Sequence, residues 1–291
     1  MIMVTRADVK TKNPHISDLI NKYLRPEHLP QIWCPGCGNG IIMRDIVQAI
    51  ENLGLSRNDV IIVSGIGCAA RSAGYMDFNT IHTTHGRAIA FATGIKLANP
   101  RLTVIVVAGD GDISAIGGNH LIHAARRNVG MTVVVMNNDT YGMTGGQASP
   151  TTPKGKYGTT APYGSLERSF DIAALAYGAG ASYAARGSAY HVPQTISLIQ
   201  EGIRHKGFSI IDVVSTCPTY YGRKNKAGDA VEMLEWQRDN MVSVEKAAKM
   251  TPEELEGKLI LGLVHQTEYK EFTFAYEELI RSHYEEKDSH E

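Results

Sequence analysis

Two groups of oxygen-bearing residues follow apolar stretches near the middle of this 291-residue chain. Gly109-Asp110-Gly111 follows the apolar run 103–108, and Asn137-Asn138 follows the run 131–136. The residues between them favour a helix, which indicates one β-α-β unit with polar residues at both strand ends, where open α/β sheets bind ligands. Asp110 offers a carboxylate and Asn138 an amide carbonyl, which are oxygen ligands that suit Mg²⁺, and the glycines let backbone amides approach an anion. The stretch therefore predicts a site for Mg²⁺ and a diphosphate.

The spacing of these groups makes the prediction more specific. Gly-Asp-Gly is followed, after the 25 residues 112–136, by Asn-Asn, a pattern that resembles the fingerprint of thiamine-diphosphate enzymes. The resemblance implies that Asp110, Asn138 and the backbone carbonyl of Thr140 hold Mg²⁺. The alternative is a structural strand end, with a tight glycine turn and with Asp and Asn as helix caps.

Cys34, Cys37, Cys68 and Cys217 are the four cysteines of the chain. Cys34 and Cys37 share a tight Pro-Gly loop, which by itself fits a redox pair, half a zinc site or half an iron–sulfur site. Cys68 and Cys217 each follow a predicted strand, 60–63 and 208–214. No secretory signal is visible at the N-terminus, so metal or redox chemistry is favoured over disulfides. Four thiolates match the ligand count of an iron–sulfur cluster or of structural zinc, and spacing alone does not choose between them.

The elements that must position these residues form a doubly wound, mostly parallel α/β sheet. Apolar runs at 60–63, 103–108, 131–136 and 208–214 predict strands, and the segments between them have helical spacing. We expect an N-terminal arm at 1–30 that packs loosely or contacts a partner, a ligand-binding domain at 31–220 and a C-terminal helical arm at 221–291. The helices of the C-terminal arm are expected around 230–237, 252–261 and 274–283. The loop 139–169 is expected to bind or cover a ligand.

Composition excludes several classes of function. With 29 basic and 30 acidic residues the formal net charge is −1, which gives no electrostatic case for binding nucleic acid or an anionic membrane surface. No apolar stretch is long enough to span a bilayer. The N-terminus has no apolar segment typical of a secretory signal, so a cytoplasmic location is expected.

An ordered set of motifs across residues 30–220 resembles the β subunits of 2-oxoacid:ferredoxin oxidoreductases. The motifs are WCPGCG, SGIGC, HGRA, GDGD, NN-x-x-YG and CPT. The resemblance implies that residues 31–220 bind thiamine diphosphate, Mg²⁺ and one [4Fe-4S] cluster, with all four cysteines as cluster ligands. The implied contacts to thiamine diphosphate are Ile66, Gly67, Cys68, Ala69, His85, Gly111, Asp112, Gly142 and Met143.

The resemblance also implies a reaction and its partners. The reaction is the oxidative decarboxylation of a 2-oxoacid with coenzyme A, which gives an acyl-CoA, CO₂ and reduced ferredoxin, with the physiological direction left open. No pyrimidine-binding domain is identified in this chain, so an α subunit is expected to supply it, in an (αβ)₂ heterotetramer. His85 and Arg71 are the candidate catalytic residues. For His85 the alternative is a helix-start cap.

The segment Tyr141–Gln147 looks like the 2-oxoglutarate members of the family, and an Arg71 guanidinium could pair with a second substrate carboxylate. Arg71 could equally lie on the surface or at a subunit interface. The sequence therefore predicts 2-oxoglutarate as substrate. Pyruvate, a broad range of 2-oxoacids, a non-oxidative decarboxylase subunit and a zinc-stabilised assembly subunit are the alternatives.

Overall fold

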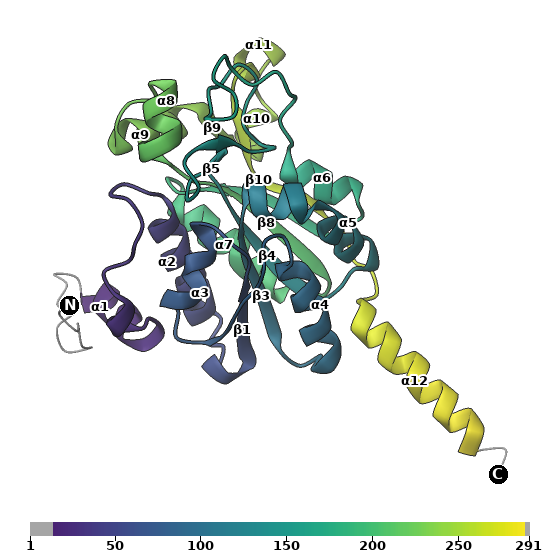
Figure 1. The fold of residues 1–291 in the computed structure, drawn as a ribbon. Helices are drawn as coiled ribbons and strands as arrows, with labels where there is room; N and C mark the ends of the chain where they lie inside the picture. The colour runs from purple at the N-terminus through teal and green to yellow at the C-terminus, as the bar shows by residue number, and fades with distance from the viewer. Residues whose placement is uncertain (1–13, 289–291) are drawn as a thin grey trace.

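The structure, a computed structural model, describes residues 14–288, and its centre is an eight-stranded sheet (Figure 1). The strands of this sheet are β1 Val60–Ser64, β2 Asn79–His82, β3 Thr103–Gly109, β4 Met131–Asn137, β7 Tyr183–Ser188, β8 Phe208–Val214, β9 Met241–Ser243 and β10 Leu259–Gln266. Their order is β2-β1-β3-β4-β8-β7-β10-β9. Neighbours are parallel except β7 and β10, which are antiparallel. The predicted doubly wound, mostly parallel sheet is confirmed.

The apolar runs that predicted strands occupy the middle of the sheet. All seven residues of β4 are buried, and β3 and β8 on either side of it are buried along most of their length. A parallel strand covered on both faces needs a nearly continuous apolar sequence, because neither side of it meets water. The central strands therefore form a rigid support whose carboxyl ends carry the predicted ligand residues.

Helices cover both faces of the sheet in two separate apolar layers. Helices α1 Pro14–Tyr23, α2 Asn39–Asn52 and α7 Val192–Arg204 contribute to one layer, and α4 Ala88–Ala98, α5 Gly118–Arg127 and α6 Ile172–Gly178 contribute to the other. The short helix α3 Ser72–Tyr75 belongs to the first layer. In α2 the predicted apolar face is buried, and the helix stops before Gly54, whose φ of +63° suits glycine.

The N-terminal arm packs more tightly than the sequence predicted. Within the described residues, Leu19, Tyr23 and Leu24 are buried in the first apolar layer, and the backbone of Leu24 pairs with that of Met76. The expectation of a loosely packed arm is wrong for this part, because its apolar helical face is buried against the domain. The part of the arm before residue 14 lies outside the described residues.

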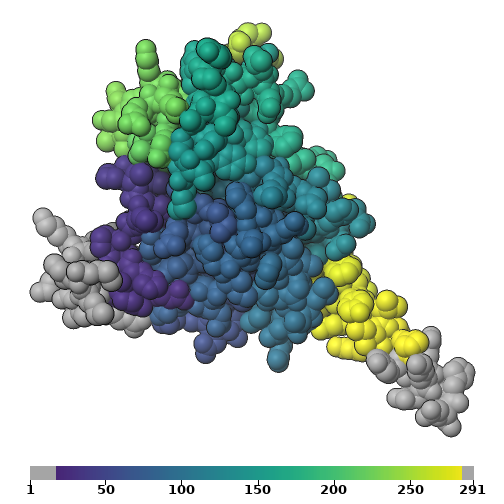
Figure 2. Space-filling view, in the orientation of Figure 1, coloured from purple at the N-terminus to yellow at the C-terminus, as the bar shows by residue number. Residues whose placement is uncertain are grey.

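The sequence predicts a C-terminal region made of helices, but the structure also has strands there. Its helices are α8 Arg223–Asn225, α9 Ala230–Asn240, α10 Val244–Ala247, α11 Pro252–Leu255 and α12 Phe272–Asp288. The helix expected at 252–261 ends early, since Gly257 takes a φ of +73° and the chain then enters β10. Strands β9 and β10 extend the main sheet beyond β7. Figure 2 shows α12, in yellow, extending away from the body of the molecule.

The long loop after β4 also has structure of its own. Strand β5, Thr140–Tyr141, pairs with β6, Gln147–Ala148, in a short hairpin. This hairpin lies above the carboxyl ends of the central strands, at the same end of the molecule as α8 and α9 (Figure 1). Among the described residues, we find no helix with the length and apolar composition needed to cross a bilayer.

Candidate active site

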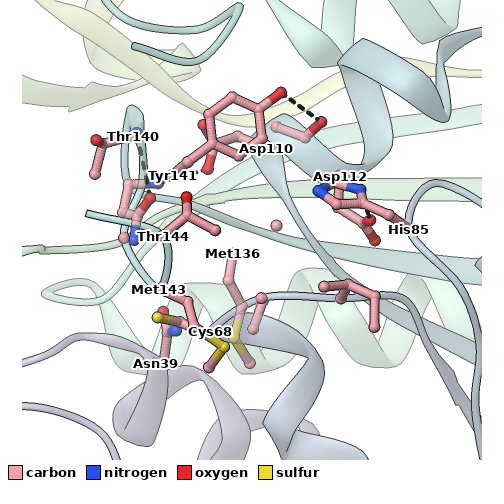
Figure 3. A pocket seen from close by; sticks show the side chains of 17 residues that line it. Asn39, Cys68, His85, Asp110, Asp112, Met136, Thr140, Tyr141, Met143 and Thr144 are labelled. Atoms are coloured by element: carbon pink, nitrogen blue, oxygen red, sulfur yellow. Dashed lines mark hydrogen bonds and ion pairs between the residues drawn. The ribbon is translucent and has the colours of Figure 1, made fainter. Parts of the chain in front are cut away.

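The carboxyl ends of β1, β3 and β4 enclose a pocket (Figure 3). All nine predicted thiamine-diphosphate contacts and all three predicted Mg²⁺ ligands line it, so the structure brings these residues together. The pocket is also lined by residues that the sequence analysis did not propose, namely Asn39, Gly109, Met136, Tyr141 and Thr144. Tyr141 belongs to the quoted NN-x-x-YG motif and Asn39 directly follows WCPGCG, so the motifs themselves could have pointed to both.

The side-chain amide of Asn138 meets two oxygen atoms at the end of β4. It lies 2.7 Å from the carbonyl oxygen of Thr140 and 3.2 Å from Asp110 Oδ1, and its nitrogen donates to both. The opposite orientation of the amide would turn its oxygen toward the same point. A carboxylate, an amide oxygen and a backbone carbonyl are a donor set that fits Mg²⁺.

The carboxylate of Asp110 is fully enclosed and held in one orientation. Its Oδ2 accepts a hydrogen bond from the Thr151 hydroxyl at 2.8 Å, and its own backbone carbonyl accepts one from Ser114 at 2.6 Å. Burial raises the pKa of Asp110 to about 6, although hydrogen bonds from Ser149 and Thr151 oppose the shift. A bound cation would offset the cost of burying this charge.

Gly111 must be glycine because of the residue that packs against it. A Cβ on Gly111 would overlap the ring of Tyr141, whose hydroxyl donates a hydrogen bond to the Gly111 carbonyl at 3.2 Å. The close approach joins the turn after β3 to the hairpin after β4. Gly111 therefore links two of the loops that form the pocket.

The four cysteines come from three separate segments that converge beside the pocket. A Cβ on Gly142 would lie 3.4 Å from the Sγ of Cys68 and 3.8 Å from that of Cys217. The Cys34–Cys37 loop is attached to the end of β8, where Gly38 N–H donates to the Thr216 carbonyl at 3.2 Å. Burial, together with the neighbouring thiols of Cys217, Cys68 and Cys34, raises the pKa of Cys37 to about 12.

Free thiols in this arrangement are costly to ionise together. Burial also raises the pKa of Cys68, to about 11, with Cys217 and Cys34 adding to the shift. Burial raises the pKa of Cys37, Cys68 and Cys217, and a cationic iron–sulfur centre would compensate the cost of ionising these thiols. Within residues 14–288, no group of three or more His, Cys, Asp or Glu side chains is arranged to hold a metal ion. Binding of an iron–sulfur cluster by these four cysteines is therefore a proposal.

The two candidate catalytic residues lie in different surroundings. His85 lines the pocket, and its Nδ1 lies 2.5 Å from Asp112 Oδ1 (Figure 3). Arg71 is exposed, its guanidinium lies 5.9 Å from the centre of the Tyr75 ring, and it is not among the residues that line the pocket. A contact between Arg71 and a substrate carboxylate stays a prediction.

Comparison with known proteins agrees with this geometry. Residues 65–213 match the family model of the thiamine pyrophosphate enzyme, C-terminal TPP binding domain. The chain is 53% identical over 251 residues to 2-oxoglutarate synthase subunit KorB of Methanothermobacter marburgensis, covering 86% of each chain. It is 51% identical over 259 residues to the KorB subunit of Methanocaldococcus jannaschii, covering 89% of this chain and 96% of that one.

A more distant relative and a solved structure extend the same comparison. The 2-oxoacid:ferredoxin oxidoreductase subunit beta of Saccharolobus solfataricus is 40% identical over 260 residues, which cover 88% of this chain and 84% of that one. The fold is similar to that of a 2-oxoglutarate:ferredoxin oxidoreductase from Magnetococcus marinus, with a TM-score of 0.79, 33% identity and 89% of both chains covered. The chain therefore belongs to the thiamine pyrophosphate enzymes and, among them, to the β subunits of the 2-oxoacid:ferredoxin oxidoreductases.

Proposed function

We propose that this chain is the β subunit of a 2-oxoglutarate:ferredoxin oxidoreductase. With an α subunit it converts 2-oxoglutarate and coenzyme A to succinyl-CoA and CO₂, and it passes the two released electrons to ferredoxin. The observation that carries this proposal is the position of Gly142. A Cβ on Gly142 would lie 3.4 Å from Cys68 Sγ, 3.8 Å from Cys217 Sγ and 3.9 Å from the Asn138 side-chain amide, so a redox centre and a diphosphate site would share one wall.

Thiamine diphosphate and Mg²⁺ fit the pocket at the carboxyl ends of β3 and β4. Asp110, Asn138 and the Thr140 carbonyl would hold Mg²⁺, because the Asn138 amide lies within 3.2 Å of both other groups and can turn its oxygen toward a cation. Thiamine diphosphate would supply the electron sink that accepts the electron pair left behind when CO₂ departs. The apolar side chains of Met136 and Met143 line the same pocket and would keep water from the reacting carbon.

The cysteine quartet is the site that we propose for a [4Fe-4S] cluster. Cys34, Cys37, Cys68 and Cys217 supply four thiols and the chain has no others. Trp33 supports this site, since its indole N–H donates a hydrogen bond to the Cys68 carbonyl at 2.7 Å. Cys34 is the exposed member of the quartet, which favours electron exit to a ferredoxin on that side.

The choice of 2-oxoglutarate is supported by the named relatives. The methanogen proteins are 2-oxoglutarate synthase subunits, and the Magnetococcus marinus structure holds 2-oxoglutarate, coenzyme A and succinyl-CoA. Those relatives are subunits of larger enzymes, which supports an α subunit as the partner of this chain as well. The family resemblance implies that the two form an (αβ)₂ heterotetramer. Arg71 remains our candidate for the distal carboxylate of the substrate.

Anaerobic co-purification of this chain with its α subunit tests the proposal. We expect a brown complex with about four irons per β chain, and coenzyme A-dependent ferredoxin reduction that is faster with 2-oxoglutarate than with pyruvate. Faster turnover of pyruvate would contradict the substrate assignment. A colourless complex containing zinc would contradict the cluster, and decarboxylation without ferredoxin reduction would contradict the oxidoreductase assignment.

A further inference from the structure

Helix α12 extends away from the body of the molecule (Figure 1) and carries an apolar stripe along one side. Phe272, Tyr276 and Leu279 are spaced by four and then three residues, which places them on one face of a helix. The Phe272 ring packs on the layer formed by α4, α5 and α6, and it stacks on Tyr276 with ring centres 6.3 Å apart. Farther along the helix, Leu279 is 65% exposed and Ile280 is 40% exposed. The stripe therefore begins in the core and continues into solvent.

The base of α12 is held on the domain by a buried carboxylate. Glu271 is 4% exposed, and it accepts hydrogen bonds from the Gly130 N–H at 2.6 Å and from the Phe274 N–H at 3.0 Å. The Thr273 hydroxyl donates a third at 2.5 Å. The outer turns of this anchored helix leave their apolar side chains exposed, whereas most helical stability in proteins comes from the packing of such a face. The stripe therefore predicts a partner.

A cavity with basic walls lies at the base of α12. Its volume is about 380 Å³, and Glu271 and Phe274 line it together with the first residues of β3 and β4. Its exposed basic residues are Arg101, Arg204 and Lys206. Within residues 14–288, no acidic side chain forms an ion pair with any of the three. Because Glu271 is already engaged by three donors, the cavity suits an acidic segment from outside the chain.

The far end of α12 has the opposite charge. Residues 285–288 read Glu-Glu-Lys-Asp. The helix has 17 residues, so its ends lie about 25 Å apart, and Ile280 is its central residue. When two copies of α12 lie antiparallel about a two-fold axis near Ile280, each apolar stripe covers the other, and each acidic end lies at the basic cavity of the opposite copy. The surface is thus complementary to itself, as a two-fold interface requires.

We propose that α12 joins two copies of this chain, paired antiparallel through Tyr276, Leu279 and Ile280, with the acidic end of each helix at the basic cavity of the other copy. The inference rests on the proposed function in one respect, since it names the surface that joins two αβ units in the expected (αβ)₂ assembly. The cavity lies at the amino ends of β3 and β4, whereas the cofactor pocket lies at their carboxyl ends. A contact through α12 therefore leaves the pocket accessible to an α subunit.

Sedimentation velocity of the complete complex tests the inference. We expect the unaltered complex to sediment as (αβ)₂. Leu279→Glu places like charges within the contact and should raise the dissociation constant into αβ halves at least about 10²-fold. Because Leu279 is exposed in the single chain, the circular dichroism spectrum should not change. Arg281→Glu is the matched control, since this exposed residue lies on the opposite face of α12, and it should leave the assembly intact.

An exchange of charges tests the antiparallel arrangement. Glu285→Lys together with Glu286→Lys should weaken the assembly at least about fivefold at low salt, because the changed end of each helix would then meet a basic cavity. Adding Arg204→Glu and Lys206→Glu to the same chain should restore the assembly. Failure of this restoration would overturn the pairing of the helix end with the cavity.

Three further results would overturn the inference. They are an unaltered complex that sediments as a single αβ unit, an (αβ)₂ assembly that Leu279→Glu does not weaken, and loss of the α subunit from that variant, which would show that α12 binds the α subunit instead. Ferredoxin reduction is measured separately on the same samples. An (αβ)₂ complex that depends on Leu279 but does not turn over 2-oxoglutarate would contradict only the proposed function.

Discussion

The side-chain amide of Asn138 lies 2.7 Å from the carbonyl oxygen of Thr140 and 3.2 Å from Asp110 Oδ1, and its nitrogen donates to both. A bound Mg²⁺ would need the amide oxygen in that place, which the opposite orientation of the amide supplies. The turn that creates this contact begins at Asp139, whose φ of +59° reverses the chain directly after β4. The loop conformation thus brings side chains from two strand ends and one carbonyl to the point proposed for Mg²⁺.

Removal of Mg²⁺ should release thiamine diphosphate from the purified complex. After treatment with EDTA we expect both to be lost together, and added Mg²⁺ should be required for the cofactor to rebind. Because burial raises the pKa of Asp110 to about 6, protons compete with Mg²⁺ for this carboxylate below that pH. The Mg²⁺ affinity, measured by titration, should therefore fall about tenfold for each pH unit below 6 and change little above it. An affinity that is flat from pH 5 to pH 7 would contradict Asp110 as a ligand.

Gly142→Ala should reduce the iron content of the complex without unfolding the chain. The added Cβ would be in ordinary contact with the Sγ atoms of Cys68 and Cys217, so a chain with free thiols tolerates it. A cluster between those sulfurs needs the same space, and we expect iron per chain to fall at least twofold. Gly94→Ala is the matched control, because no atom of the described residues lies within 4 Å of the added methyl group and α4 should accept alanine. Equal iron content in both variants would contradict a cluster at this position.

The sequence predicted the pocket well because its residues belong to strand ends. Asp110, Asn138 and Cys68 each follow a strand that an apolar run defines, and parallel strands bring their carboxyl ends to one edge. The ion pair between His85 and Asp112 could not be predicted in this way, since it depends on a π-helical turn and on glycines in two other loops. Local patterns identify residues on an edge but not the contacts between the loops that follow.

The C-terminal strands were missed although β10 has an apolar sequence. Its residues 259–264 read LILGLV, yet most of the strand is exposed or intermediate because it lies near the end of the sheet. Acidic residues in Pro252–Leu255 favour a helix start, and the helix forms as expected there. Gly257, with a φ of +73°, turns the chain after this helix, and β10 begins at Leu259.

Arg71→Ala should raise the KM for 2-oxoglutarate about tenfold or more and leave turnover of pyruvate unchanged. A guanidinium can pair with a second carboxylate, which pyruvate lacks, and such charge-assisted contacts are stronger than neutral hydrogen bonds. In the described chain the Arg71 side chain is exposed above Tyr75, so it would have to reach the substrate from the rim of the site. Arg101→Ala, at another exposed arginine, is the control. Equal effects on both substrates would show that Arg71 is a surface or interface residue.

Asp45 should make the folded chain more stable at acidic than at neutral pH. It lies on α2 and is 0% exposed, and neither of its oxygens has a hydrogen-bond partner within residues 14–288, so burial raises its pKa from 3.8 to about 7 despite Arg44 nearby. A carboxyl with a raised pKa contributes its full stability below its unfolded pKa and loses it as pH rises toward the folded pKa. Between about pH 4 and pH 7 the free energy of unfolding should therefore fall by up to about 1.4 kcal/mol per pH unit from this group. Asp45→Asn removes that dependence, so urea unfolding should find the variant more stable than the native chain at pH 8 and nearly equal to it at pH 4. A stability difference that does not change with pH would show that the Asp45 carboxylate is solvated or paired in the folded chain.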